Sequence, residues 1–464
     1  MVPEKMPGKW DYEYDVVVVG AGTAGFPAAI EAHDAGAKAV ILEILPIIAP
    51  SLPLINVGPA FAGTDMQESQ GVKDSPEDYY RDGVEIAKGD PELWKVFSVA
   101  QLDTYHWCKK IGMTFEPRLF SPPGHRITRG VWKKGSEILR SLEKAARERG
   151  IEVKLQHRAI RLVTDTATGR VLGVKVRIKD KEEKYFKAKK AVVIATGGFG
   201  RSKELIGEFG PYFLDWLPTM GHGHLGDGLK MAMDLGAATK EINHAVCGSF
   251  GVDIDTKSAI TDFVGYAGGL FVNVNGERFA DESMRQYFYG IVNERGMKQP
   301  GHVWFSIFDE KMRTTTLKAD MLHKAKPVVG NTMEELAQKL GIDPAGLRKT
   351  VDKYNKNIDK LGKDPDFERT TLCGCEGKPM KFEVPPFYGM KCTGSISSFK
   401  GGVKINTKTQ VINQYGEVIP GLYAAGEVTG GMWGHDGTYL PCTLVTAGMA
   451  FGRIAGKNAS QEPG

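Results

Sequence analysis

One short segment near the N-terminus constrains the fold more than any other part of this chain. Val16–Val19 is a run of four β-branched residues, typical of a buried strand in a parallel sheet. The glycine-rich sequence GAGTAG follows at residues 20–25, and an alanine-rich stretch typical of a helix comes next. A second apolar strand, Ala39–Leu42, ends at Glu43. This order predicts a βαβ unit of a Rossmann-like sheet.

Each glycine of the turn has its own physical task. Gly20 permits the tight turn, Gly22 lets the backbone approach a pyrophosphate, and Gly25 lets the helix pack closely on the strand. The helix that follows Thr23 and Ala24 offers unpaired N–H groups and the positive end of its dipole, both of which favour phosphate. The turn is therefore suited to hold the phosphates of a dinucleotide.

Glu43 stands about 20 residues beyond these glycines, where a carboxylate accepts hydrogen bonds from a ribose hydroxyl. We therefore predict a dinucleotide site, although this motif does not separate FAD from NAD. The alternative interpretation is a structural βαβ turn that binds nothing.

Composition narrows the class of protein without naming a partner. The 464 residues are 42% hydrophobic and 25% charged, ordinary values for a globular protein with two domains or one interrupted domain. A formal net charge of +4 gives no case for nucleic-acid or anionic-membrane binding. Met1–Tyr14 carries no export signal and no apolar run is long enough to span a membrane, so we expect a cytoplasmic protein without a transmembrane segment.

The six cysteines are scattered, and only Cys373 and Cys375 are close together. A protein metal site needs about four ligands, and no second pair or nearby histidine supplies them. We therefore predict no metal and interpret the cysteines as reduced thiols. The CxxCH motif that attaches haem is also missing from the sequence.

The middle of the chain alternates between short strands and turns. Strands are predicted at Ile151–Leu155, Ala159–Thr164, Val171–Arg177 and Phe186–Ala188, and we interpret them as a β-meander inserted in the parallel sheet. A buried strand at Ala191–Ala195 then runs into a glycine-rich turn, where the chain can pass close to something flat or bulky.

A set of motifs that spans most of the chain, in order, resembles the flavoprotein family of fumarate reductase, succinate dehydrogenase and the 3-ketosteroid dehydrogenases. The motifs are GAGTAG with Glu43, IATGGFG at 194–200, GDG at 226–228, GGLFVNVNGERFADE at 268–282, GGVKINTKTQVI at 401–412, IPGLYAAGEVTGG at 419–431 and GMAFGRIAG at 448–456. The resemblance implies an α/β fold, in which a Rossmann-like FAD-binding domain with a parallel sheet and a β-meander is interrupted by an α+β capping domain. The implied bounds are 1–242 and 393–464 for the FAD-binding domain and 243–392 for the cap, with the active site between them.

When the motifs of the family are matched to this sequence, the resemblance implies which residues hold FAD. They are Gly20, Gly22, Thr23, Ala24, Gly25 and Glu43 for the ADP half, Ala159 for the adenine, Thr196, Gly197 and Gly198 along the cofactor, Asp227 for the phosphate or ribityl region, Gly426 and Glu427 for the ribityl chain, and Thr443 and Leu444 for the flavin pyrimidine. Ser51 and Gly58, in a loop rich in Pro and Gly, are placed to close over the flavin or to belong to an ordinary surface loop. For Asp227 and Glu427 the alternative is helix N-capping. The lone histidines His125, His222 and His224 are interpreted as structural or cofactor-adjacent.

Single residues separate the branches of this family. The fumarate reductases hold a dicarboxylate with a histidine before the glycine pair and an arginine before the closing helix, whereas this sequence has Ser398 and Tyr439 there. Cys247 lies near the position of a further expected histidine. Without those cations the desolvation of two carboxylates would be poorly offset, so we do not expect a dicarboxylate substrate. Tyr439 and Lys400 fit the pattern of the ketosteroid dehydrogenases instead.

That branch implies desaturation of a C–C bond beside a ketone in a cyclic or steroid-like substrate, with the α-proton taken by a base and the β-hydride passed to flavin N5. Tyr439 is the candidate for the base or for the ketone donor, and backbone N–H groups near Cys442 would help to bind the enolate oxygen. Tyr287 is a second candidate. Arg285 lies near the position where fumarate reductases place their proton-donating arginine.

Two other functions stay open at this point. An ene-reductase would reduce an enone or enoate with Arg285 or Tyr287 as the proton donor. A non-catalytic flavin-binding subunit would leave the chemistry to another protein. The implied partners are a small-molecule ketone or enone and an electron acceptor, which would be a quinone, a small redox carrier or a protein.

Overall fold

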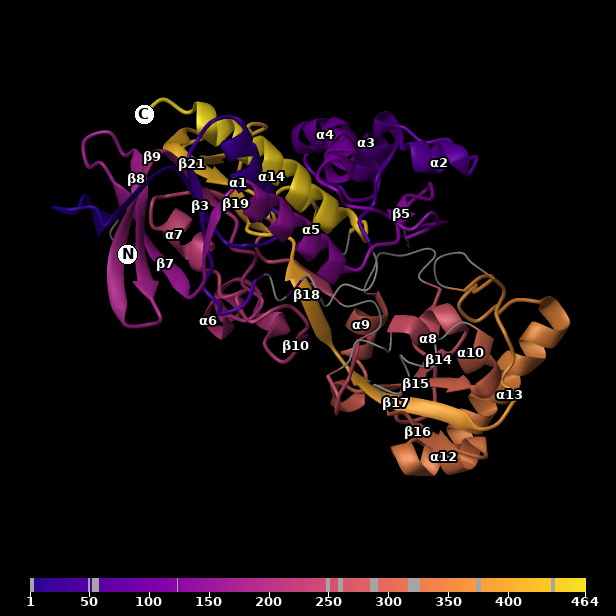
Figure 1. Ribbon diagram of the computed structural model, residues 1–464. Helices are drawn as coiled ribbons and strands as arrows, with labels where there is room; N and C mark the ends of the chain where they lie inside the picture. The colour runs from indigo at the N-terminus through magenta and orange to yellow at the C-terminus, as the bar shows by residue number, and fades with distance from the viewer. Residues whose placement is uncertain are drawn as a thin grey trace. The chain divides into compact units, whose positions relative to one another are not determined.

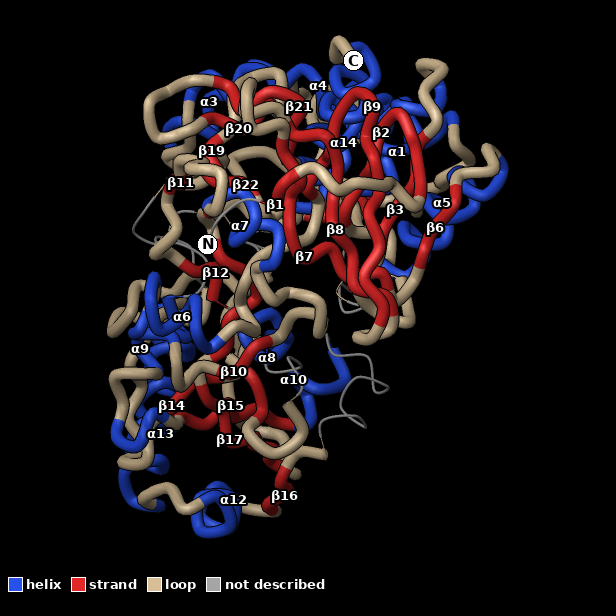
Figure 2. The backbone as a smooth tube through the Cα atoms, turned by 90° about the vertical axis from the view of Figure 1, so that its left-hand side faces the viewer, coloured by secondary structure: helices blue, strands red, loops and turns tan. Residues whose placement is uncertain are grey.

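The computed structural model describes residues 4–48, 51, 58–122, 124–247, 251–257, 262–283, 291–315, 326–372, 377–434 and 439–464. Contacts divide the chain into two compact units (Figures 1 and 2). Unit 1 comprises Met1–Leu214, Met220–Ala245 and Ser398–Gly464, and unit 2 comprises Asp215–Thr219 and Val246–Ser397. The predicted catalytic residues Arg285 and Tyr287, together with Cys373 and Cys375, lie outside the described residues.

Unit 1 contains the glycine-rich turn and the sheet around it. Its strands are β1 (Glu4–Lys5), β2 (Tyr12–Val19), β3 (Ala39–Leu42), β4 (Leu119–Phe120), β5 (Gly130–Val131), β6 (Glu152–Lys154), β7 (His157–Thr164), β8 (Val171–Ile178), β9 (Glu182–Ile194), β11 (Thr239–Lys240), β19 (Gly402–Lys404), β20 (Gln410–Ile412), β21 (Val418–Ala424) and β22 (Thr429–Gly430). Its helices are α1 (Gly25–Asp34), α2 (Asp65–Ser69), α3 (Pro76–Glu85), α4 (Pro91–Lys110), α5 (Gly135–Glu148), α6 (Lys203–Phe209), α7 (Asp227–Met233) and α14 (Thr443–Gln461).

The main sheet of unit 1 runs in the order β1-β7-β8-β9-β2-β3-β6 (Figure 2). Strand β9 connects its antiparallel and parallel parts. The first half of β9 pairs antiparallel with β8, whereas the last residues of β9 pair parallel with β21 on the same edge. The other edge of β9 pairs parallel with β2 along most of its length. The carboxyl ends of β2, β9 and β21 therefore meet at one edge of the sheet, which is where ligands bind in open α/β sheets.

Two predictions about the meander are wrong in detail. Phe186–Ala188 and Ala191–Ala195 are not separate strands, because β9 continues through Lys189 and Lys190. Residues 152–154 form β6, which pairs parallel with β3 rather than joining the meander. The two lysines interrupt the apolar pattern on which the prediction rested, but the backbone pairing with β2 carries the strand across them. A bulge between Tyr14 and Val16 adjusts the register there.

The closing helix α14 packs against α1 and α4 (Figure 1). A Cβ atom on Gly452 would lie 2.3 Å from the Ala24 carbonyl oxygen, and one on Gly456 would lie 2.0 Å from the Ala28 carbonyl oxygen. These distances are far below van der Waals contact, so only glycine allows this approach. The glycines give α14 a smooth face, which seats its N-terminus beside the glycine-rich turn of α1.

Unit 2 is a smaller α+β assembly. Its elements are β10 (Leu217–Pro218), β13 (Val252–Asp253), α8 (Asp262–Ala267), β14 (Leu270–Val272), α9 (Ile291–Gly296), β15 (Trp304–Asp309), α10 (Glu310–Thr315), β16 (Val328–Gly330), α12 (Met333–Leu340), α13 (Pro344–Leu361) and β17 (Phe387–Thr393), and β18 (Ser395–Phe399) begins in it. Strands β13, β14, β15, β16 and β17 pair antiparallel. A buried ion-pair network under α13 joins Arg278 to Glu282 and Asp364.

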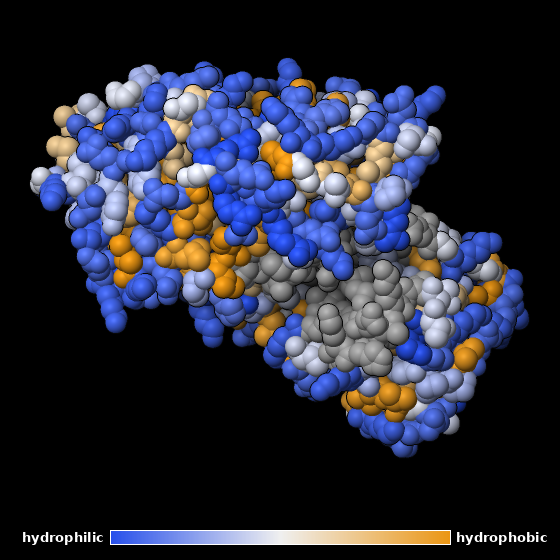
Figure 3. All heavy atoms as spheres, in the orientation of Figure 1, coloured by the Kyte–Doolittle hydropathy of each residue, from blue (hydrophilic) through white to orange (hydrophobic). Residues whose placement is uncertain are grey.

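Hydrophilic residues predominate on the face that Figure 3 shows, and hydrophobic residues form small separate groups. The exposed large apolar side chains come from elements far apart in the chain, among them Tyr12, Tyr212, Val329 and Tyr415. Scattered apolar residues of this kind are normal on a protein surface. Within the described part of the chain, no helix combines the length and the apolar character that crossing a membrane requires.

Candidate functional site

A cleft in unit 1 opens at the edge where β2, β3, β9 and β21 end. It contains about 1080 Å³ of space that no protein atom fills, part of which is open to solvent. Most of the predicted cofactor residues line it, namely Gly20, Gly22, Thr23, Ala24, Glu43, Ala159, Thr196, Gly197, Asp227, Gly426, Glu427 and Leu444. Ser51, His157, Arg158 and His224 line it as well.

The glycine-rich turn has the local geometry that phosphate binding needs. Gly20 has a φ of +110°, a conformation that L side chains rarely adopt, and a Cβ on Gly25 would lie 1.8 Å from the Gly20 carbonyl oxygen. A Cβ on Gly22 would meet nothing within 4 Å, so the space beside Gly22 is open to a ligand. Helix α1 starts at this turn without a side-chain cap on its first N–H groups. Those groups and the helix dipole therefore face the cleft ready for an anion.

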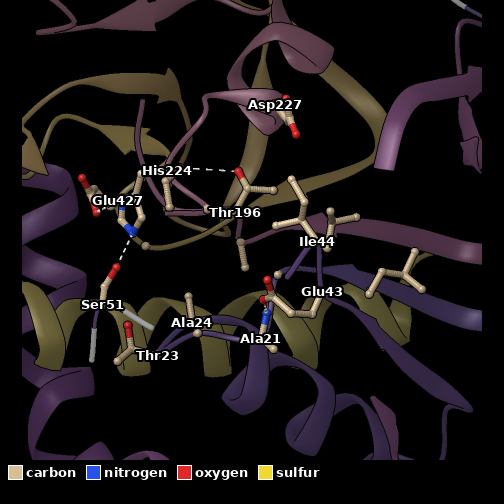
Figure 4. Close-up of a pocket in the computed structure, with 18 of the residues that line it drawn as sticks. Ala21, Thr23, Ala24, Glu43, Ile44, Ser51, Thr196, His224, Asp227 and Glu427 are labelled. Atoms are coloured by element: carbon tan, nitrogen blue, oxygen red, sulfur yellow. Dashed lines mark hydrogen bonds and ion pairs between the residues drawn. The ribbon is translucent and has the colours of Figure 1, made fainter. Parts of the chain in front are cut away.

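Glu43 is held in place by the backbone of the turn (Figure 4). One carboxylate oxygen accepts from the Ala21 N–H at 3.1 Å, and the other accepts from the Leu45 N–H at 2.9 Å. Burial raises the pKa of the Glu43 carboxyl, and the two backbone donors oppose that shift. Each oxygen keeps a lone pair for a hydroxyl donor, as recognition of a ribose requires.

Asp227 is engaged by a partner that the sequence did not indicate. Arg158 holds it in a bidentate pair, with both nitrogen–oxygen distances at 2.8 Å. Asp227 is also the first residue of α7, and its neighbour Gly226 has a left-handed conformation with a φ of +76°. The carboxylate therefore stabilises the helix start and Arg158 in addition to lining the cleft.

Glu427 lies between the glycine-rich turn that follows β9 and the loop that precedes α7 (Figure 4). One of its oxygens, Oε2, is 3.2 Å from His224 Nδ1. The other, Oε1, is buried and has no hydrogen-bond partner among the described residues. A buried acceptor without a donor is costly, and a hydroxyl of a ribityl chain is the kind of donor that satisfies it. The cleft thus fits a dinucleotide with a polyol chain, as FAD has.

A turn before α14 brings together Tyr439, Cys442 and Thr443. Tyr439 is half-buried, and its ring lies 4.9 Å from that of Trp433 at 63°. Cys442 has a φ of +68° and precedes α14 without capping it. Burial raises the pKa of the Cys442 thiol to about 12, so the thiol stays protonated and the predicted role of this residue falls to its backbone.

Residues from α3 and the loop before β5 hold this turn from behind. The hydroxyl groups of Tyr79 and Thr443 are 2.6 Å apart in a fully buried hydrogen bond. His125 Nε2 lies 2.9 Å from the Pro441 carbonyl oxygen and donates to it. Burial lowers the pKa of His125 to about 3, so this histidine is neutral. Its predicted structural role agrees with this contact.

Two glycines that are predicted to contact the cofactor are also closely approached by protein atoms. A Cβ on Gly58 would lie 1.9 Å from the Val131 carbonyl oxygen, and Gly58 is not among the described residues that line the cleft. A Cβ on Gly198 would lie 2.5 Å from Glu427 Oε1. Both positions are glycine because protein atoms approach closely. The array of Ser51, His224 and Glu427 was missed by sequence reasoning, since its members lie far apart along the chain and share no motif.

Comparison with known proteins shows to which family this chain belongs. The model of the FAD binding domain matches residues 15–438. A probable fumarate reductase of Shewanella frigidimarina is 32% identical over 461 residues, covering 96% of this chain and 74% of that protein. The open conformation of a flavocytochrome c3 fumarate reductase matches with a TM-score of 0.84 at 32% identity, covering 97% of this chain and 79% of that one. The 3-ketosteroid-delta4-(5alpha)-dehydrogenase of Rhodococcus jostii matches with a TM-score of 0.79 at 25% identity, covering 99% and 100%.

These matches confirm the predicted fold class and the predicted cofactor, FAD. The geometry of the glycine-rich turn, Glu43 and Glu427 fits that cofactor independently. The chain is an FAD-dependent oxidoreductase, and it belongs to the flavoprotein family of fumarate reductases and succinate dehydrogenases, which has the 3-ketosteroid dehydrogenases as one branch.

Proposed function

We propose that this enzyme desaturates the C–C bond beside the carbonyl of an uncharged, cyclic ketone. The observation that carries the proposal is the half-buried phenol of Tyr439, which stands at the entrance of α14 where a dicarboxylate enzyme needs a cation. The Rhodococcus jostii relative, whose structure holds 4-androstene-3,17-dione, supports a steroid-like substrate. The fumarate reductase relatives are more similar to the chain as a whole, at 32% identity and a TM-score of 0.84, so the direction of the reaction is part of the proposal.

The environment of Tyr439 favours the donor role over the base role. Burial is the main cause that raises the pKa of Tyr439, and the neighbouring Cys442 and Glu427 raise it further. A phenol with a raised pKa stays protonated at neutral pH, so it donates a hydrogen bond well and removes a proton poorly. Tyr439 would therefore polarise the ketone oxygen and stabilise the enolate that forms when the α-proton leaves. The base is proposed to be Tyr287.

The start of α14 supplies a second stabilising element. Cys442 leaves the first N–H groups of the helix without a side-chain cap, and the positive end of the helix dipole lies at the same point. FAD, when bound, accepts the β-hydrogen with its electron pair at N5. Thr443 and Leu444 are proposed to present these N–H groups to the negative charge that the reduced cofactor gains.

Two arginines of the described loop before β5 are already paired with carboxylates of the protein. Arg129 is fully buried and paired with Asp74 and Asp82, and Arg126 is paired with Asp82 and Glu85. Their charges are already neutralised by these four contacts, so a second carboxylate from a substrate would gain little from them. This arrangement supports an uncharged substrate.

The proposal is tested by anaerobic mixing of the oxidised holoenzyme with saturated cyclic ketones. We expect bleaching of the flavin absorbance with a cyclic 3-ketosteroid or a smaller cyclic ketone, and no bleaching with succinate. In the reverse direction, enzyme reduced by dithionite is mixed with enones and with fumarate. Rapid reoxidation by fumarate alone would overturn the ketone proposal. Reoxidation by enones without bleaching by ketones would make the enzyme an ene-reductase.

A further inference from the structure

His224 sits in the wall of the FAD cleft, between Ser51 and Glu427 (Figure 4). Its Nε2 is 2.7 Å from the Ser51 hydroxyl oxygen, and its Nδ1 is 3.2 Å from Glu427 Oε2. The imidazole lies flat on the backbone at Gly197, where a Cβ would come within 2.9 Å of it. The ring is thus hydrogen-bonded at Nε2 and covered on one face, whereas its Nδ1 lies within ion-pair distance of Glu427 without a hydrogen-bond partner among the described residues.

The Ser51 hydroxyl has a proton whose direction depends on His224. Its oxygen already accepts from the Gly221 N–H at 2.8 Å. When His224 is neutral with its proton on Nδ1 toward Glu427, Nε2 is an acceptor and takes the Ser51 proton. When His224 is protonated, Nε2–H donates to the Ser51 oxygen instead. The hydroxyl then has both lone pairs occupied, and its own proton is released to donate into the cleft.

We propose that Ser51, His224 and Glu427 form a protonation-linked clamp on FAD, which holds the cofactor more tightly when His224 carries a proton. Two effects strengthen FAD binding when His224 is protonated. The freed Ser51 proton donates to an oxygen of the ribityl or pyrophosphate chain, and the positive imidazolium attracts the pyrophosphate. The proposal concerns cofactor binding alone, so it stands or fails independently of the reaction at Tyr439.

The charges around His224 favour its protonated form. Burial alone would lower the pKa of His224, but the carboxylate of Glu427 outweighs burial and raises it above the ordinary 6.5. Glu43 acts in the same direction and Arg201 in the opposite one. Because the pKa is raised, the clamp is fully formed below pH 6.5 and is lost as the pH rises through the raised value. The bound pyrophosphate, being negative, extends the protonated range further.

The test measures FAD release from the holoenzyme, followed as the fluorescence of free flavin after dilution between about pH 6 and pH 9. We expect the release rate of the wild type to rise about tenfold over this range, the factor that corresponds to one pKa unit of coupling. His224→Gln keeps a hydrogen-bonding side chain but cannot titrate, so its release should be fast and independent of pH. His106→Gln is the matched control, because His106 is an exposed histidine on α4 of the same unit and is not among the described residues that line the cleft. It should keep the wild-type profile.

Two further variants separate the parts of the clamp. Glu427→Gln should move the midpoint of the pH profile to lower pH, because the carboxylate that raises the pKa of His224 is gone. Ser51→Ala should reduce the tenfold rise, because the released hydroxyl proton no longer exists. A wild-type profile in His224→Gln, or an unmoved midpoint in Glu427→Gln, would overturn the proposal. A full tenfold rise in Ser51→Ala would overturn the role given to the hydroxyl.

Discussion

Tyr439→Phe is expected to slow reduction of the flavin by a ketone substrate by about 10²–10³-fold, the effect of removing one donor from a developing oxyanion. The ring and its contact with Trp433 remain in this variant, so the shape of the turn is kept. The variant removes the hydroxyl group that is proposed to polarise the ketone oxygen. The measurement is the single-turnover rate of flavin bleaching in stopped flow, with the bound flavin spectrum as the check that FAD is retained.

Tyr423→Phe is the matched control for this prediction. Tyr423 lies on β21 in the same unit and gives its hydroxyl proton to Glu462, away from the cleft. Its loss should leave the bleaching rate unchanged. Equal rates in Tyr439→Phe and the wild type would remove Tyr439 from the chemistry and leave only the scaffold assignment.

Arg129→Met is expected to lower the free energy of unfolding by about 3–5 kcal/mol, the usual effect of breaking a buried ion pair by removing one partner. Arg129 is fully buried and donates to Asp74 at 2.8 and 2.9 Å and also to Asp82. Without it Asp74 stays buried without its guanidinium partner, and Asp82 keeps its 3.4 Å ion-pair contact with Arg126. The measurement is urea unfolding of the holoenzyme, read as a lower midpoint at an unchanged slope.

The same substitution should also loosen the turn before α14. The Arg129 guanidinium lies 4.4 Å from the centre of the Tyr79 ring, and Tyr79 holds Thr443 through its hydroxyl. Arg126→Gln is the control, because Arg126 makes ion pairs from the same loop with a side chain that is 47% exposed. Exposed pairs contribute about 0–1 kcal/mol. A destabilisation of Arg129→Met as small as that of Arg126→Gln would show that the buried network is not what holds this region.

The cofactor half of this protein was predictable because its signals are local. Val16–Val19, the glycines after it and Glu43 follow each other within one βαβ unit, and each residue type is required by backbone geometry or by one hydrogen bond. The glycines of α14 were predictable for the same reason, since a glycine at every fourth position marks one face of a helix. The branch of the family to which this chain belongs is proposed from single residues such as Tyr439.

Other features of the site depend on contacts between residues that lie far apart in the sequence, and the spacing of residues in a motif does not indicate such contacts. Asp227 was expected to contact the cofactor, and the structure pairs it with Arg158, which is 69 residues away. Gly198 is predicted to lie along the cofactor, and the structure also places it against Glu427. The second half of β9 could not be joined to the first from the sequence, because Lys189 and Lys190 break its apolar pattern.

The amino-acid sequence by itself determined the dinucleotide turn, the order of the strands and helices around it and the cofactor that they bind. Only the tertiary structure decided that Ser51 and His224, separated by 173 residues, share a proton in the wall of the cleft. The physical reason is the distance along the chain over which each kind of interaction acts. Backbone conformation and helix or strand periodicity act over a few neighbouring residues, whereas hydrogen bonds and ion pairs form between whichever side chains the sheet order brings together.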